Sequence, residues 1–582
     1  MARKFWPLAK FMLRTLPGWR WRLPLTLLVG AADIAVLILI PLAGAKIIDS
    51  LAAGSWDDFR HHLTVLGGLT FAQVFVGLTH RYAFLCVDER SGNALRQRLV
   101  ETALRKPLGF FDRHWVGDLV SRAINDSSLL KGFITGVLLQ MVYDTASLIV
   151  VAVILVRMNP VLAALTMATA PITLVYGRTV RRRLEAAALR VRENVAAVTG
   201  HLQSWLSRPL AIKAYSLESV AARSFRRRND ELTRNSVRSG LLGAGVGAAN
   251  ATLLGIPSLL IFGYGGYLTF KGGLSVGSLF AFMTFSAYFS GPAQRFVNAA
   301  VATLPTLYPV FDRLQEILEP EDLEPTWAPR PLPAVSRIAA SNITFGFEKD
   351  PGYRLIVPDF HAKRGEVIGI VGPNGAGKST LGRLLAGLSH PTAGTVTLGR
   401  EVDRHWSGPR RRRLFGFLPQ EPAVFDGTLL ENLTLFDDLV DEARVARVIE
   451  LLDVDSWIDS LPQGVNTPIN AGLATKFSVG QIKKIGLGRL LYRDPPILLL
   501  DEPAAGLDES SQGRLAEIID RGRERRIAIV MTHSPATVAL CDRVYRLRPL
   551  PGEARGFECV EDTARSQPGG DLRGLLAASP VA

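Results

Sequence analysis

The pentad Phe477-Ser-Val-Gly-Gln481 decides how this chain is interpreted, because of the two motifs that flank it. The glycine-rich stretch Gly372-Pro-Asn-Gly-Ala-Gly-Lys378-Ser379 precedes it, and the apolar run Ile497-Leu-Leu-Leu-Asp501-Glu502 follows it. Glycines before a Lys-Ser pair let backbone N–H groups curl around phosphate oxygens. Residues 367–371 predict a buried strand before this loop, and Ser379 opens a predicted helix, which is the setting that phosphate binding requires. The three motifs together indicate a domain that binds and hydrolyses a nucleoside triphosphate.

Composition indicates a second domain of a different kind. The chain has 582 residues, which exceeds one ordinary core, so at least two domains are expected. Its mean hydropathy is +0.19 although 21% of the residues are charged, which indicates that apolar and charged segments are separated. The net charge of +14 fits either nucleic-acid binding or basic cytoplasmic loops. Cys86, Cys541 and Cys559 lie far apart and predict free thiols, with no disulfide framework or zinc site.

The first half of the chain has six apolar stretches long enough to cross a bilayer, near 23–43, 63–85, 133–156, 160–177, 241–264 and 275–300. The connections 86–132 and 178–240 are long and basic, and their apolar spacing predicts helices that extend the spans. The positive-inside rule places them in the cytoplasm, together with the N-terminus and everything after the sixth span. Topology therefore explains the basic charge, and we expect no nucleic-acid partner.

The segments outside the spans also have distinct compositions. Residues 1–22 are basic and aromatic and predict an interfacial amphipathic helix, with Trp6, Phe11, Trp19 and Trp21 at the bilayer surface. Five prolines crowd into 319–335, which predicts a linker. Strands and helices alternate over 336–549, as in a soluble α/β domain, and the Gly- and Pro-rich residues 550–582 predict a disordered tail.

The order of phosphate loop, Ser-x-Gly-Gln pentad and apolar-Asp-Glu run, after six spans, resembles the ATP-binding cassette (ABC) superfamily, in its exporter-type half-transporter branch. The resemblance implies a multidomain fold: an all-α six-helix transmembrane domain over 23–318 with long cytoplasmic helical extensions, then an α/β P-loop ATPase cassette. It implies coupling segments near 110–118 and 211–218, which would dock on a cassette. It also implies integral membrane localisation, which for a bacterial chain is the inner membrane, with the cassette in the cytoplasm.

The same resemblance assigns roles to residues. Glu502 polarises the attacking water, and His533 is the switch histidine at the γ-phosphate. Ser379, Gln420 and Asp501 hold Mg²⁺, and Phe347 stacks on adenine in place of the more common Tyr. Asp508 belongs to the D-loop at the dimer interface. The pentad residues Ser478, Gly480 and Gln481 contact ATP held by the opposite subunit. The ATP contacts on the phosphate loop are Gly372, Pro373, Asn374, Gly375, Ala376, Gly377, Lys378, Ser379 and Thr380.

Two departures from the family pattern concern the coupling of ATP to transport. The pentad of the family reads Leu-Ser-Gly-Gly-Gln, and here Phe477 and Val479 replace the Leu and the first Gly. Family members that have Val at this position are regarded as active, so we expect a functional site. Exporters usually have a Glu just before the pentad, and none occurs between 466 and 476, so coupling through that contact is in doubt.

A split ATP site implies a dimer, and a homodimer is the simpler case because one chain has all the motifs. The expected function is ATP-driven export of a small molecule or peptide by alternating access. Alternatives within the family are a lipid floppase, a siderophore-type importer and a regulatory partner subunit of a heterodimer. Asp33 and Asp144 lie within predicted spans, where charge is costly, so we expect them to face a wet cavity or partners. No residue run identifies the substrate.

Overall fold

The computed structural model describes residues 2–299, 303–319, 323–324, 335–347, 350–399, 401–402, 411–469, 477–553 and 555–562. The chain forms two compact units. The helical unit comprises 1–103 and 116–319, and the sheet unit comprises 104–115 and 320–582. Most of the expected linker 319–335 lies outside the described residues.

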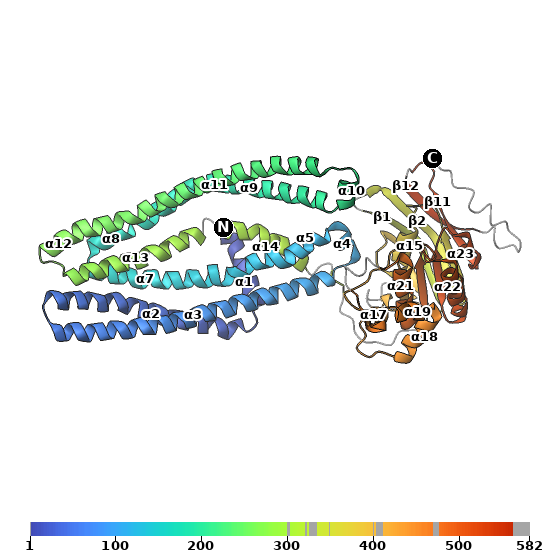
Figure 1. Cartoon of the computed structure of the whole chain (residues 1–582), viewed down its shortest axis with the longest axis horizontal. Coiled ribbons are helices and arrows are strands. Elements are labelled where there is room, and N and C mark those ends of the chain that lie inside the picture. The colour runs from blue at the N-terminus through green and yellow to red at the C-terminus, as the bar shows by residue number, and fades with distance from the viewer. Residues whose placement is uncertain are drawn as a thin grey trace. The chain divides into compact units, whose positions relative to one another are not determined.

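Long helices make up the helical unit (Figure 1). Helices α9 and α11 run side by side, and α13 packs on α2 and α7. Phe282 and Phe285 of α13 are fully buried in the apolar core that this helix shares with α7 and α8. The helices are α1 (Ala2–Thr15), α2 (Trp19–Ala52), α3 (Trp56–Leu104), α5 (Val116–Ser121), α6 (Ser127–Phe133), α7 (Gln140–Met158), α8 (Pro160–Met167), α9 (Thr169–Leu206), α10 (Pro209–Ala214), α11 (Glu218–Leu260), α12 (Gly266–Phe270), α13 (Val276–Asn298) and α14 (Leu304–Leu318), with π-helical turns at Arg122–Asp126, Ile134–Leu139 and Ile261–Gly265.

Within the described residues, four helical stretches are long and apolar enough to cross a membrane: Trp19–Ala52, Trp56–Leu104, Val116–Met158 and Glu218–Phe270. They contain the first, second, third and fifth predicted spans. The fourth predicted span is divided between α8 and α9, and the sixth coincides with α13. These two spans are helical but are not among the four, so the total of six remains a prediction.

The connections predicted to be helical extensions are largely helical, since α3, α9 and α11 run through them. The N-terminal segment also forms the expected helix, α1, and Trp6 is exposed. Phe11, however, packs on Phe311 of α14 with ring centroids 5.4 Å apart. One face of α1 is thus covered by α14, and the interfacial position of the segment stays a prediction.

A ten-stranded sheet forms the sheet unit, in the order β5-β4-β1-β2-β12-β11-β3-β10-β9-β6. Its strands are β1 (Arg337–Phe347), β2 (Asp350–Lys363), β3 (Val367–Val371), β4 (Ala393–Leu398), β5 (Glu401–Val402), β6 (Phe415–Leu418), β9 (Ile497–Asp501), β10 (Ile527–Met531), β11 (Arg543–Pro549) and β12 (Arg555–Glu561), and β7 (Gly427–Thr428) pairs with β8 (Pro468–Ile469). The helices are α4 (Leu108–Arg113), α15 (Lys378–Ala386), α17 (Leu429–Thr434), α18 (Glu442–Leu452), α19 (Asp455–Asp459), α21 (Val479–Arg493), α22 (Glu509–Arg521) and α23 (Pro535–Ala539).

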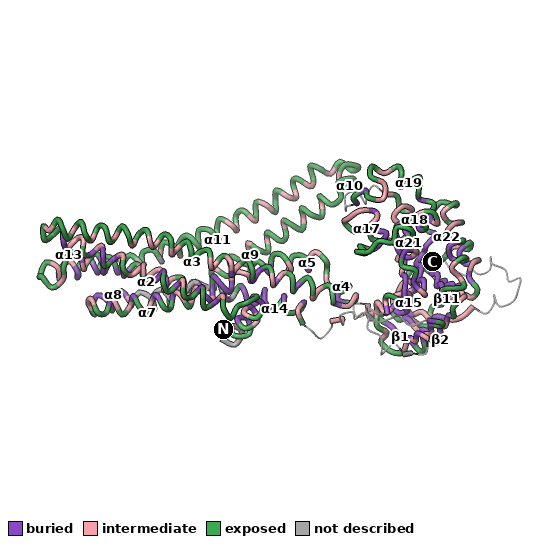
Figure 2. The backbone as a smooth tube through the Cα atoms, turned by 90° about the horizontal axis from the view of Figure 1, so that it is seen from below, coloured by how far each residue is buried: buried purple, intermediate pink, exposed green. Residues whose placement is uncertain are grey.

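Apolar cores cover both faces of this sheet, which explains why its central strands lack polar alternation. Ile368 and Ile370 of β3 belong to one buried cluster, and Val367 and Val371 belong to the other. Successive side chains of a strand point to opposite faces, so the two clusters lie on opposite sides of the sheet. Figure 2 shows buried residues gathered around these strands and many exposed residues along the long helices. The predicted strands at 367–371 and before Asp501 are confirmed.

The last strand corrects one expectation. Residues 550–582 were expected to be a disordered tail, yet Arg555–Glu561 forms β12, which pairs with β2 and β11. Cys559 is 1% exposed, and Phe557 packs on the same core cluster. The Gly, Pro and Arg content of the segment concealed the alternation of these apolar residues. Residues 563–582 lie outside the described part.

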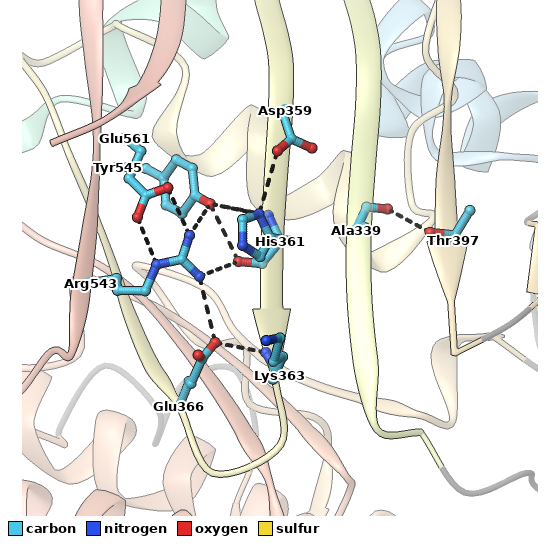
Figure 3. Close-up of polar contacts among 9 residues, drawn as sticks. All are labelled: Ala339, Asp359, His361, Lys363, Glu366, Thr397, Arg543, Tyr545 and Glu561. Atoms are coloured by element: carbon cyan, nitrogen blue, oxygen red, sulfur yellow. Dashed lines mark hydrogen bonds and ion pairs between the residues drawn. The ribbon is translucent and has the colours of Figure 1, made fainter. Parts of the chain in front are cut away.

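A polar network joins β2, β11 and β12 (Figure 3). Arg543 donates two hydrogen bonds to the carboxylate of Glu561, at 2.7 and 2.8 Å, and one to the backbone oxygen of His361 at 3.3 Å. The hydroxyl of Tyr545 accepts from Arg543 at 2.9 Å. The hydrogen bond from Arg543 lowers the pKa of Glu561 below its ordinary value. The network therefore stabilises β12, the last described strand of the chain, between β2 and β11.

We predict that Glu561→Gln lowers the melting temperature of the full chain in detergent at pH 7, because Arg543 loses its charged partner. Because the pKa of Glu561 is lower in the folded than in the unfolded chain, its ionised carboxylate adds to the free energy of unfolding above the ordinary pKa of about 4.5. This contribution is lost as the pH falls through the lowered pKa. The difference from wild type therefore shrinks in acid. Solvent screening keeps the effect at about 1 kcal/mol or less. Glu553→Gln, which removes a half-buried acid that pairs with the exposed side chain of Arg354, is the control. An equal effect of both changes would contradict the assignment.

Candidate functional site

The phosphate loop joins the buried end of β3 to the start of α15, the strand–loop–helix order that the sequence predicted. Gly375 has a φ of +78° and Gly377 a φ of +100°, conformations that residues with a Cβ rarely adopt. A Cβ on Gly372 would lie 2.9 Å from Leu547, so this glycine also permits close packing. The ammonium of Lys378 donates to the backbone oxygen of Gly372 at 2.9 Å and therefore lies over the loop.

A cavity of about 360 Å³ opens beside this loop. Phe347 and Gln420, predicted from separate motifs, both line it together with Asp501 and Glu502. Ala376 is fully buried in the core and does not line it. The lining residues are Phe347, Asp350, Tyr353, Pro373, Asn374, Gly375, Gly377, Lys378, Ser379, Thr380, Gln420, Asp501, Glu502 and Arg555. The cavity thus combines an aromatic wall with the loop and with two acids.

Asp501 and Ser379 form the part of the cavity that fits a magnesium ion. The hydroxyl of Ser379 hydrogen-bonds to the carboxylate of Asp501, which is 3% exposed. Burial raises the pKa of Asp501, and the hydrogen bond from Ser379 opposes that shift. Mg²⁺ usually binds one or two carboxylate or hydroxyl oxygens together with phosphate oxygens. Within the described ranges, no group of three His, Cys, Asp or Glu residues is placed to hold a metal ion.

Glu502 and His533 form a contact pair at the carboxyl ends of β9 and β10. Nδ1 of His533 lies 2.8 Å from Oε1 of Glu502. Glu502 is 7% exposed, whereas the side chain of His533 is 68% exposed. Glu502 has a φ of +45°, an uncommon conformation for a residue other than glycine, and one that clusters at functional sites. Its N–H donates to the oxygen of Met531 at 2.9 Å, which fixes the turn against β10.

Lys483 is a residue of this site that the motifs did not indicate. It lies on α21, directly after the pentad, and is 1% exposed. Its ammonium donates to the backbone oxygens of Glu502 at 2.5 Å and Ala505 at 2.7 Å. Burial lowers the pKa of Lys483, while the charges of Glu502 and Asp501 oppose that shift. A lysine within a run of helical residues carries no sequence signal for such a position.

Sequence reasoning also missed Asp350, Tyr353 and Arg555 in the cavity wall. Arg555 forms a 2.5 Å ion pair with Asp350. Tyr353 lies so close to Gly377 that a Cβ there would collide with its hydroxyl. Burial raises the pKa of Tyr353. Arg555 lies on β12, in the segment expected to be a tail, so its position could not be foreseen.

The pentad does not line this cavity. Ser478 is the N-cap of α21, and its hydroxyl accepts from the N–H of Gln481 at 3.1 Å. The side chain of Gln481 accepts from the N–H of Ser478 at 2.8 Å, which completes a capping box. Gly480 lies within the same first turn. Asp508 caps α22 in the same way, and its hydrogen bonds with Ser511 lower its pKa.

Val479 is 66% exposed at the start of α21. Its side chain lies next to Gly506, where an added Cβ would come within 2.9 Å of it. The replacement of glycine by valine therefore causes no steric conflict inside one chain. Residues 470–476, which cover most of the segment without the expected Glu, lie outside the described part.

Comparison with known proteins identifies both units. The family model of the ABC transporter transmembrane region matches residues 23–293, and the ABC transporter model matches residues 357–505. The chain is 26% identical over 468 residues to an ATP-dependent lipid A-core flippase from Syntrophus aciditrophicus, covering 79% of this chain and 76% of that protein. It is 24% identical over 545 residues to a putative multidrug export ATP-binding/permease protein from Staphylococcus aureus, covering 92% and 94%.

Two further relatives extend this picture. A mitochondrial potassium channel ATP-binding subunit from Xenopus tropicalis is 28% identical over 496 residues, covering 82% of this chain and 70% of that protein. The solved structure of a bacterial Atm1-family ABC exporter with ATP bound matches with a TM-score of 0.80 at 20% identity, covering 97% of this chain and all of that one. That likeness establishes the exporter-type fold.

The two family models together match well over half of the residues, so this chain belongs to the ABC transporter superfamily and joins a membrane-spanning domain to an ATPase that drives transport.

Proposed function

We propose that the chain exports a small molecule or peptide, using ATP held between the cassettes of two copies. One observation carries the dimeric part of this proposal. The cavity has the phosphate loop and both acids, but Ser478, Gly480 and Gln481 lie outside its lining. The exposure of Val479 leaves the pentad open to a second copy. A homodimer supplies each cavity with a pentad from the opposite chain.

Six residues of the cavity wall, and His533 beside it, have roles in this proposal. Phe347 presents a π-face to adenine, and Lys378 neutralises phosphate charge. Ser379, Asp501 and Gln420 would hold Mg²⁺, which would offset charge on the phosphates. Glu502 accepts a proton from the attacking water, and His533 orients that carboxylate through the 2.8 Å contact.

Glu324 connects the segment before β6 with the start of α4 inside the sheet unit. Its carboxylate accepts two hydrogen bonds from Arg412, at 2.7 and 2.6 Å. Its N–H donates to the oxygen of Arg105 at 2.8 Å, just before α4, which lies in the first expected coupling segment. Arg412 precedes β6, and the loop after β6 contains Gln420. These contacts support coupling between the ATP cavity and α4.

The alternatives receive different support. The lipid A-core flippase among the relatives favours a lipid floppase as the second candidate. The relative described as an ATP-binding subunit of a potassium channel corresponds to the regulatory alternative, but the intact Glu502–His533 pair favours hydrolysis. No specific observation favours an importer. The match to the transmembrane-region family model supports an integral membrane protein, which we place in the bacterial inner (cytoplasmic) membrane with the cassette in the cytoplasm.

We predict that Glu502→Gln lowers ATP hydrolysis in proteoliposomes by about 10²-fold or more, because the variant loses its general base. The amide retains the size of the side chain, so ATP binding persists and is checked by equilibrium binding of a fluorescent ATP analogue. Glu509→Gln, on α22 and outside the cavity, is the matched control. Wild type that hydrolyses no ATP would refute the pump and leave the regulatory alternative.

Lys483 has a positioning role in the same reaction. Its ammonium links the first turns of α21 to the backbone oxygen of Glu502 and to the next turn of chain. The helix that begins with the pentad therefore holds the turn that carries the general base. Closure of a second copy on the pentad is thus transmitted to Glu502 through this lysine.

We predict that Lys483→Met lowers kcat for ATP hydrolysis by at least tenfold and changes KM for ATP by less than threefold. Methionine keeps the length of the side chain but removes both hydrogen bonds from the ammonium to the turn. A hydrogen bond from a charged group contributes about 1.5–3 kcal/mol. Lys363→Met removes an exposed lysine of the sheet unit and serves as the control. A rise in KM with unchanged kcat would assign Lys483 to binding rather than to positioning.

A further inference from the structure

A second cavity, of about 810 Å³, lies within the helical unit. It follows α3 from Gln73 to Asp88, which at 1.5 Å per residue corresponds to roughly 22 Å of helix. Its lining residues are Asp33, Gln73, Val74, Gly77, Leu78, His80, Arg81, Phe84, Leu85, Asp88, Thr135, Gly136, Gln140 and Tyr143. They come from α2, α3, the π-helical turn Ile134–Leu139 and α7.

The carboxylate of Asp33 lies at one end of this cavity. Asp33 is 7% exposed and lies on the apolar helix α2. It accepts hydrogen bonds from Tyr143 at 2.7 Å and from the amide of Gln73 at 2.9 Å, and Nδ1 of His80 lies 3.4 Å away. A charged group in a membrane-spanning helix is costly, and such residues usually mark a functional site.

These contacts fix which atoms remain available. The amide nitrogen of Gln73 faces the carboxylate, so its oxygen Oε1 is directed elsewhere. Nδ1 of His80 lies beside the carboxylate, and Nε2 is the acceptor in the tautomer that has its proton on Nδ1. Both Oε1 of Gln73 and Nε2 of His80 are buried, and neither has a hydrogen-bond partner among the residues that the structure describes. Buried acceptors without partners are unfavourable, and a ligand that donates hydrogen bonds satisfies them.

The other buried or partly buried acids near this cavity, Asp144 and Asp88, have basic partners. Arg295 of α13 forms an ion pair with Asp144 at 2.7 Å, so the second acid predicted to face a cavity has a partner. At the far end, Asp88 accepts from Thr135 at 2.6 Å and lies 3.5 Å from Lys131. Arg81 also lines the cavity, but its side chain is exposed to solvent, which screens its charge. Asp33 is therefore the buried acid of this cavity that no Lys or Arg of the described residues pairs with.

Aromatic rings surround the same carboxylate. The rings of His80 and Tyr143 are stacked with centroids 5.0 Å apart, and Phe84 meets His80 edge-on at 4.6 Å. Val74, Leu78 and Leu85 continue the wall as apolar surface. Aromatic faces attract a cation that is desolvated beside them.

We propose that this cavity binds a primary organic ammonium ion with an aromatic or apolar body. A primary ammonium has three N–H donors. The site offers the carboxylate of Asp33, whose four acceptor positions are not filled by the hydrogen bonds from Tyr143 and Gln73, together with the free acceptors of Gln73 and His80. The apolar wall along α3 accommodates the rest of the molecule. This inference rests on the proposed transport function, for which it names a substrate class.

The test compares three indole compounds of similar shape by equilibrium binding to the full-length protein in lipid nanodiscs, without ATP. Tryptamine has a primary ammonium, its N,N,N-trimethyl derivative has the same charge but no ammonium N–H, and tryptophol is neutral. We expect tryptamine to bind at least tenfold more tightly than either. Equal binding of tryptamine and the trimethyl compound would overturn the hydrogen-bonding site, and equal binding of tryptophol would overturn the role of charge.

Variants locate the binding. Asp33→Asn keeps the shape of the side chain but removes its charge, and we expect at least a tenfold loss of tryptamine affinity. Gln73→Met removes the free acceptor, and we expect it to weaken tryptamine binding at least threefold. If size-exclusion chromatography shows that Asp33→Asn does not fold, this second variant still decides the test. Asp57→Asn, an equal change of charge at an exposed position on the same helix as Gln73, leaves affinity unchanged. Unchanged affinity in Gln73→Met would overturn the proposal.

Failure of this inference is distinguishable from failure of the proposed function. Tryptamine binding is measured without nucleotide. If the chain binds tryptamine but hydrolyses no ATP, the proposed binding site stands and the proposed pump function is refuted. If inverted vesicles take up another compound when ATP is supplied but the chain does not bind tryptamine, the proposed pump function stands and the proposed binding site is overturned.

Discussion

The placement of two acids at the end of one buried strand is the constraint on which the ATP site depends. Strand β9 is apolar and buried over its whole length, so Asp501 and Glu502 emerge together where the sheet ends. Asp501 then meets Ser379 beside the phosphate loop, while the backbone turns through a positive φ and directs Glu502 toward His533. The two acids have different neighbours and therefore different roles. The buried lysine of α21 holds the turn in place.

A second constraint concerns how polar groups are distributed in the helical unit. The helices that are apolar enough to cross a membrane still contain acids, and each buried acid has partners on other helices. Asp144 and Arg295 neutralise each other and join α7 to α13. Asp33 is different, because no Lys or Arg of the described residues pairs with it, and Gln73 and His80 beside it each have a buried polar atom without a partner. Buried charge requires compensation. Asp144 receives it from Arg295 within the chain, whereas Asp33 would receive it from the proposed ligand.

Motifs in the sequence predicted the parts of the cassette that lie next to regular elements. The phosphate loop, Asp501, Glu502 and His533 each follow an apolar run that could only be a buried strand, so their convergence at one edge was predictable. Lys483, Asp350 and Arg555 were not, because their positions depend on which segments the fold brings beside the cavity. Composition also misled at β12, where glycine and arginine concealed a strand. In the helical unit, Asp33 and Asp144 were recognised as costly, but their different partners follow from helix packing.

The central claim is that each ATP site combines the phosphate loop of one chain with the pentad of another. It is tested most directly in mixed dimers, isolated through two different tags, of Lys378→Ala chains with Gly480→Asp chains. The first change removes the charge at the phosphates, and the second places a carboxylate where the opposite chain's γ-phosphate is expected. The account predicts that neither variant hydrolyses ATP alone, whereas the mixed dimer does, because one of its two sites then has an intact loop and an intact pentad. A mixed dimer as inactive as both parents would contradict the account and place each complete site within a single chain.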